Sequence, residues 1–123
     1  MGIEKINKEE FLNSFLYDIF RFSDKEYQKR AWIEGTGPEY GDFDEAVMWF
    51  LEDGEIVMNH YKEFGVTENQ NLLIKMFWDE ITSFSDKNAW PLEFIDTLEW
   101  TKIMEMAKKV LKAFHWKTPI PEK

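Results

Sequence analysis

Residues 11–22 read FLNSFLYDIFRF, and this stretch decides the fold class of the chain. Its apolar side chains recur at every third or fourth position, which is the spacing of one wide face of an α-helix. They form two neighbouring rows on that face: Phe11, Phe15, Ile19 and Phe22, and beside them Leu12, Leu16 and Phe20. A face of this width predicts a helix that begins at Asn7 or Lys8, ends near Ser23, and buries its apolar rows in a core.

Similar apolar periods follow downstream, introduced by residues that cap helices. Asp42 with Glu45, and Thr67 with Gln70, have the three-residue spacing of a capping box, in which two residues satisfy each other's backbone N–H groups. Residues 25–33 are either a short helix or an extended arm. The other expected helices cover residues 8–22, 42–53, 56–64, 67–88 and 97–114.

The breaks between these helices are assigned from glycine and proline. Residues 35–41 hold three glycines and a proline, which predicts a loop. Gly54 is expected to end a helix, although Asp53-Gly54 is also a β-hairpin signal and leaves that alternative open. Trp90-Pro91 predicts an extended step. The connector that follows is expected to bury Leu92, Phe94 and Ile95.

Length and composition set the class of protein. The chain has 123 residues, of which 44% are hydrophobic and 17% aromatic, enough to fill one core. The fold is therefore predicted to be all-α, a compact single-domain bundle of five or six helices over residues 1–123, with residues 117–123 as a frayed tail. Cysteine is absent, which excludes disulfides and a thiolate nucleophile. No apolar run approaches the ~18 residues of a membrane span, and we expect a cytoplasmic protein.

The negative charge of the chain is concentrated in one quarter of the sequence. The formal net charge is −9, and residues 31–61 contain no lysine or arginine. They carry eight carboxylates: Glu34, Glu39, Asp42, Asp44, Glu45, Glu52, Asp53 and Glu55. Such a charge repels phosphates, so direct binding to nucleic acid or to an anionic membrane is not expected. A basic protein is the natural partner.

The acids of this segment fall into two groups, whose positions have different explanations. Asp42, Asp44 and Glu45 suit the first turn of a helix, where the helix dipole favours negative charge. Glu52 and Asp53 are expected at the end of that helix, where the dipole disfavours them. Two explanations stay open for this mismatch: solvation of the two side chains alone, or attraction of a basic partner. Trp49 and Trp32 flank the acids, as core residues or as interface anchors. The predicted partner-binding residues are Glu34, Glu39, Tyr40, Asp42, Asp44, Glu45, Trp49, Glu52, Asp53 and Glu55.

Catalytic and metal-binding patterns are weak. His60 lies at helical spacing from Glu63, so a small metal-dependent hydrolase that uses clustered carboxylates near His60 is one alternative function. Asp42-x-Asp44 begins like a calcium loop, but an alanine and a valine follow where a ligand and a glycine are required. We therefore assign no catalytic residue, metal ligand or cofactor. A plain helical adaptor is the other alternative.

The chain resembles the small cytoplasmic immunity proteins of bacterial toxin systems, including contact-dependent growth inhibition and related polymorphic toxins. The resemblance is carried by a short acidic domain, the lack of cysteine, the many aromatics and the block GPEYGDFDEAVMWFLEDGE at residues 37–55. It implies a non-enzymatic inhibitor that binds one cognate toxin, often a basic nuclease. The oligomeric state does not follow from it.

Overall fold

The computed structural model describes residues 7–35 and 41–116 of the chain. Within these residues it contains six α-helices and one π-helical segment, Lys29–Glu34, that continues directly from α2; no strand is present there. The helices are α1 (Lys8–Arg21), α2 (Lys25–Gln28), α3 (Phe43–Asn59), α4 (Glu68–Lys87), α5 (Pro91–Phe94) and α6 (Leu98–Ala113). The all-α prediction is confirmed, and the predicted tail lies outside the described residues.

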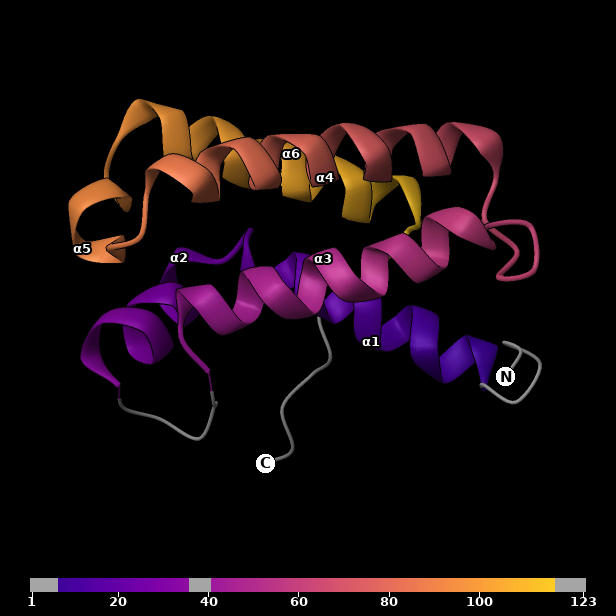
Figure 1. The fold of residues 1–123 in the computed structure, drawn as a ribbon, viewed down its shortest axis with the longest axis horizontal. Helices are drawn as coiled ribbons and strands as arrows, with labels where there is room; N and C mark the ends of the chain where they lie inside the picture. Colours follow the sequence, from indigo (N-terminus) through magenta and orange to yellow (C-terminus); the bar gives the residue numbers. More distant parts are fainter. Residues whose placement is uncertain (1–6, 36–40, 117–123) are drawn as a thin grey trace.

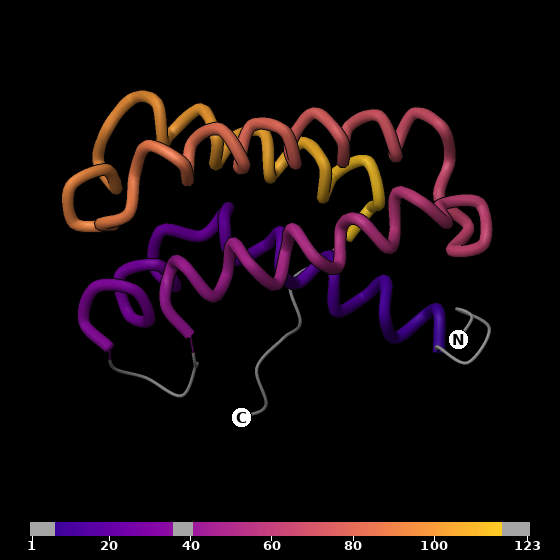
Figure 2. Tube along the Cα trace, in the orientation of Figure 1, coloured from indigo at the N-terminus to yellow at the C-terminus, as the bar shows by residue number. Residues whose placement is uncertain are grey.

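The four long helices form a bundle of two layers. α1 and α3 make one layer, and α4 and α6 make the other (Figure 1). Around the bundle, α3 packs against α1 and α4, and α6 packs against α4 and α1. The short α5 and the π-helical segment pack against each other at one end of the bundle, as the chain trace shows (Figure 2). No helix of the described chain has the length and apolar character needed to cross a bilayer.

The predicted helix starts are confirmed by the geometry of their caps. Asp42 Oδ1 accepts from the Glu45 amide at 3.0 Å, and Glu45 Oε1 accepts from the Asp42 amide at 3.2 Å. Thr67 and Gln70 form the same reciprocal pair, at 3.0 and 2.9 Å. Local chemistry therefore sets where α3 and α4 begin. The side chains of Asn7 and Thr97 cap α1 and α6 by a single bond each, accepting from the backbone N–H three residues later.

A fully buried tryptophan, Trp100, lies at the centre of the core. Its indole Nε1 donates to Gln28 Oε1 at 2.9 Å, and Gln28 Nε2 donates to the Arg21 carbonyl at 3.0 Å. Because a buried amide must find partners, these bonds tie the segment after α1 to α6. Residues 25–33 are accordingly helical rather than an extended arm. The rings within 6.4 Å of Trp100 are those of Phe22, Trp32, Phe43, Phe84 and Phe94.

The prediction that Gly54 ends a helix is wrong. Gly54 is buried inside α3, which runs unbroken to Asn59, so neither a separate helix over residues 56–64 nor a hairpin at Asp53-Gly54 forms. A Cβ atom on Gly54 would stand 2.7 Å from Trp78 Cδ1 and 3.4 Å from Phe15 Cε1. Trp78 is held there because its Nε1 donates to the Leu51 carbonyl at 3.0 Å. The glycine permits close packing between helices, and flexibility is not its role.

The connector after Trp90 also departs from prediction at one residue. Phe94 and Ile95 are buried as expected, but Leu92 is 75% exposed. The reason is that residues 91–94 form the short helix α5, whose single turn directs only one side inward. Phe94 packs against the ring of Phe84 at 5.0 Å on that side.

Replacing Gly54 with alanine should destabilise the fold. Alanine favours a helix by about 1 kcal/mol over glycine, but overpacking a filled core costs about 1–3 kcal/mol. We expect a net loss of about 1 kcal/mol in the free energy of unfolding, measured by urea denaturation followed by circular dichroism. The same substitution made in a Trp78→Leu background should cost less or become stabilising. A single Gly54→Ala variant that is more stable than the parent would contradict this account.

Candidate functional site

The acids of α3 that face solvent form one row. Asp44, Met48, Glu52 and Glu55 follow one another at spacings of four, four and three, so they lie on the same side of the helix. All four are exposed, and Met48 is 47% exposed. We call these residues, with the neighbouring exposed Glu45, the acidic face. Met48 is the apolar member of an otherwise charged surface.

The carboxylates of the acidic face make no direct ion pair among the described residues. α3 itself contains no lysine or arginine. Among the described residues, no ion pair involves Asp44, Glu52 or Glu55. The lysines of α6 are exposed, but α6 packs against α4 and α1, and Lys108 pairs within α6 with Glu105 at 3.2 Å. Asp44, Glu52 and Glu55 are therefore exposed on one helix and form no ion pair with a described residue.

Asp53 does not belong to this face. It lies inside α3, so the expected placement of Glu52 and Asp53 at a helix end is wrong. The argument that the helix dipole disfavours these two residues is therefore wrong as well. The carboxyl group of Asp53 is half-buried and meets the carboxyl group of Asp18 from α1. Sequence reasoning missed Asp18, although a signal was present. Asp18 interrupts the apolar rows between Phe15 and Phe22, at spacings of three and four.

Asp18 and Asp53 form a buried carboxyl pair with Arg21. Asp18 is 5% exposed, and its Oδ1 accepts from Arg21 Nη1 at 2.6 Å. Its other oxygen, Oδ2, is buried and receives no donor from an N–H or hydroxyl group. Two ionised carboxylates cannot hydrogen-bond each other, so a proton between them supplies the missing donor. The pair therefore favours a state in which one proton is retained.

The surroundings raise the pKa of both carboxyl groups. Burial raises the pKa of Asp18 to about 7, with a further rise from Asp53 and an opposing effect from Arg21. Burial also raises the pKa of Asp53, as does the charge of Glu52, whereas the hydrogen bond with Asp18 acts in the other direction. Asp18 is accordingly the member that holds the proton, and Asp53 is the acceptor.

Arg21 is held by aromatic rings as well as by Asp18. Its guanidinium carbon lies 4.7 Å from the centre of the Tyr17 ring and 5.7 Å from that of Trp49. Trp49 also packs beneath Gly41, where an added Cβ would stand 2.8 Å from its Cη2 atom. Trp49 is thus half-buried between Arg21 and the start of α3, and Trp32, at 8% exposure, is a core residue.

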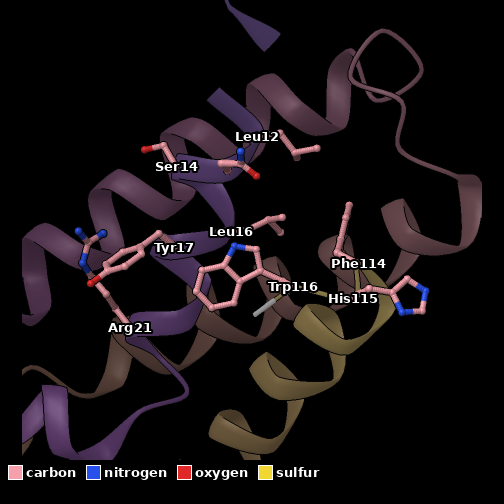
Figure 3. Close-up of a pocket in the computed structure, with 9 residues that line it drawn as sticks. Leu12, Ser14, Leu16, Tyr17, Arg21, Phe114, His115 and Trp116 are labelled. Carbon is pink, nitrogen blue, oxygen red and sulfur yellow. The ribbon is translucent and has the colours of Figure 1, made fainter. Parts of the chain in front are cut away.

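A wide cavity is lined by no residue of the acidic face. It is an open groove of about 800 Å³ between α1 and the residues that follow α6 (Figure 3). In Figure 3 the Trp116 indole extends towards Tyr17 and Leu16, and the tryptophan and tyrosine ring centres are 6.2 Å apart. Arg21 and His115 are its basic residues. Sequence reasoning did not find this groove because its two walls come from opposite ends of the chain.

The remaining predicted residues are placed as follows. Asp42 is exposed at the start of α3, and Glu34 is exposed at the end of the π-helical segment. Glu39 and Tyr40 lie outside the described residues. His60 Nδ1 is 2.9 Å from Glu63 Oε1 at the edge of a hollow formed by residues 59–63 alone. Within the described chain, no three His, Asp or Glu side chains converge in a way that could hold a metal ion.

Comparison with known proteins adds no assignment. No protein-family model matches the chain, and neither the curated proteins nor the solved structures give a significant match.

The carboxyl pair predicts an unusual dependence of stability on pH. The folded protein retains a proton up to a pH of about 7, whereas an ordinary aspartate in the unfolded chain releases it near 3.8. Since the unfolded state then binds fewer protons, the contribution of Asp18 to stability falls as the pH rises from about 4 to 7 and is lowest above 7.

The variant Asp18→Asn tests this dependence. The asparagine amide can donate to Asp53 as the protonated acid does, and its carbonyl can accept from Arg21. We expect the variant to match the parent near pH 4.5 and to exceed it in free energy of unfolding near pH 8, measured by urea denaturation at each pH. Glu80→Gln, at an exposed carboxyl group on α4, should give no such divergence. Parallel curves for Asp18→Asn and the parent would show that Asp18 titrates normally.

Proposed function

We propose that this protein is a non-enzymatic binding protein of the immunity type, which neutralises a cognate bacterial toxin domain in the cytoplasm. The toxin is a basic protein, for example a nuclease, and the acidic face of α3 covers its cationic surface. The observation that carries the proposal is the row of Asp44, Glu52 and Glu55, which are exposed on one helix side and form no ion pair with a described residue.

Electrostatics supports a partner of this charge. Carboxylates three and four residues apart on a helix repel one another, at about 0.2–0.5 kcal/mol for each pair. In the acidic face this spacing holds for Glu52 and Glu55, and their repulsion is relieved when a basic surface meets them. A concentrated field also raises association rates by roughly 10–10³-fold and rejects anionic competitors. Met48, in the middle of the acidic face, provides the adaptable apolar contact that binding surfaces often contain.

The directions of the side chains favour binding over hydrolysis. The acids of α3 that reach solvent lie along the outside of a helix, whereas acid–base catalysis needs groups that converge on one substrate atom. The His60 side chain contacts Glu63, which is only three residues later in the chain. A binding protein uses its carboxylates spread over a surface, which is how α3 presents them.

Removing charge from the acidic face should slow association. The partner to test is the C-terminal domain of any large toxin-like protein encoded immediately upstream. We expect the triple variant Asp44→Asn, Glu52→Gln, Glu55→Gln to associate about tenfold more slowly at low salt and to show a weaker dependence on ionic strength. Stopped-flow fluorescence at several salt concentrations gives both quantities.

A matched variant controls for the change in net charge. It removes three exposed carboxylates from other helices: Glu80→Gln, Asp86→Asn and Glu99→Gln. If the control slows association as much as the α3 variant, net charge alone is responsible and the acidic face has no special role. An unchanged rate for the α3 variant would reject the proposed face.

A further inference from the structure

One corner of the molecule combines aromatic walls with carboxylates. A cavity of about 220 Å³ lies between the start of α3 and the start of α5. Trp32, Phe43 and Trp90 supply its aromatic walls, and Asp42 and Asp44 supply its acids. Its volume is smaller than a typical small-molecule pocket and suits a single side chain.

Trp90 is the unusual element of this corner. Its side chain is 69% exposed, although an indole is usually buried in a protein of this size. The position is fixed by backbone chemistry, because Trp90 is extended and precedes Pro91 at the first turn of α5. Leu92, two residues later, is 75% exposed. Tryptophan is enriched at the energetic centres of protein interfaces, and neighbouring exposed apolar side chains can mark such a surface.

The two acids are available to an occupant. Asp42 uses Oδ1 for the capping box of α3, which leaves Oδ2 outside that interaction. Asp44 is exposed and takes part in no ion pair among the described residues. In addition, Trp32 is 8% exposed and its indole Nε1 is buried without an acceptor. Lysine and arginine side chains have no acceptor for this donor, so recognition of such an occupant rests on the two acids and the aromatic walls.

We propose that this corner receives one lysine or arginine side chain of the basic partner, with the aliphatic stem against Trp90 and the cation near Asp42 and Asp44. The inference rests on the proposed function and deepens it, because Asp44 belongs both to the cavity and to the acidic face. The cavity thus forms one end of the same surface. A cation is attracted by aromatic faces and by carboxylates together. An anion is repelled, and a purely apolar side chain leaves both carboxylates unpaired.

Short peptides test the cavity without the natural partner. The probe is acetyl-Leu-Lys-Leu-amide, and the matched control is the same peptide with norleucine, which keeps the stem and removes the charge. We expect the lysine peptide to shift the indole N–H signal of Trp90 and the amide signal of Asp44 saturably, with a Kd in the millimolar range and weaker binding at high salt. The readout is the two-dimensional ¹H–¹⁵N spectrum of the intact protein.

Two substitutions define the outcome. Trp90→Ala should weaken peptide binding by about tenfold. Leu72→Ala, at another exposed apolar residue on α4, should leave it unchanged. Equal shifts with the norleucine peptide would show a plain apolar patch and overturn the proposal. Shifts with the lysine peptide at residues other than Trp90 and Asp44 would also overturn it.

The test separates the two proposals. Peptide binding at Trp90, together with no effect on partner association of Glu52→Gln and Glu55→Gln made without Asp44→Asn, supports the cavity and rejects the rest of the acidic face. The reverse result, in which α3 charges control association but Trp90→Ala and the peptide have no effect, rejects the cavity and leaves the proposed function standing.

Discussion

The close approach of α3 to α1 and α4 at Gly54 is the constraint on which the rest of the structure depends. Trp78 lies against the backbone of α3, tied by its bond to the Leu51 carbonyl, and Phe15 fills the space from the other side. A helix seated this closely cannot turn about its axis without expelling one of these rings. The rotation of α3 is thereby set, with Phe50 and Val57 inside and Asp44 and Glu52 outside.

The same rotation divides the acidic segment into two parts with different physics. The outward acids are hydrated, and their mutual repulsion is moderated by solvent and salt. Asp53 is turned towards α1 and lies near Asp18 and Arg21, in a region of low dielectric. The free-energy cost of a second negative charge is high in that region, so the Asp18–Asp53 pair keeps a proton instead. A single acidic stretch in the sequence thus contains an exposed row of carboxylates and a proton-holding contact between two helices.

Local chemistry predicted what is local in this fold. The caps at Asp42 and Thr67 and the apolar rows of α1 were readable because their partners lie within one helical turn. Gly54 was misread because the reason for a glycine there is supplied by Trp78 and Phe15, which are distant in sequence. The carboxyl pair was missed for the same reason, since Asp18 and Asp53 become neighbours only when α1 packs on α3. When a residue is needed for a tertiary contact, the residues next to it in the sequence do not reveal that contact.

The aromatic core explains how an acidic face is tolerated. Repulsion along α3 amounts to a fraction of a kcal/mol for each pair of acids, whereas each large aromatic side chain that is fully buried contributes about 2–3 kcal/mol. Trp100 and Phe50, both fully buried, face this core from α6 and α3. Phe50 and its stacked neighbour Phe15 lie on the side of α3 opposite the acids, with ring centres 5.6 Å apart. Burial on one side of α3 therefore offsets the charge on the other, and the outward face is free to be selected for a partner rather than for stability.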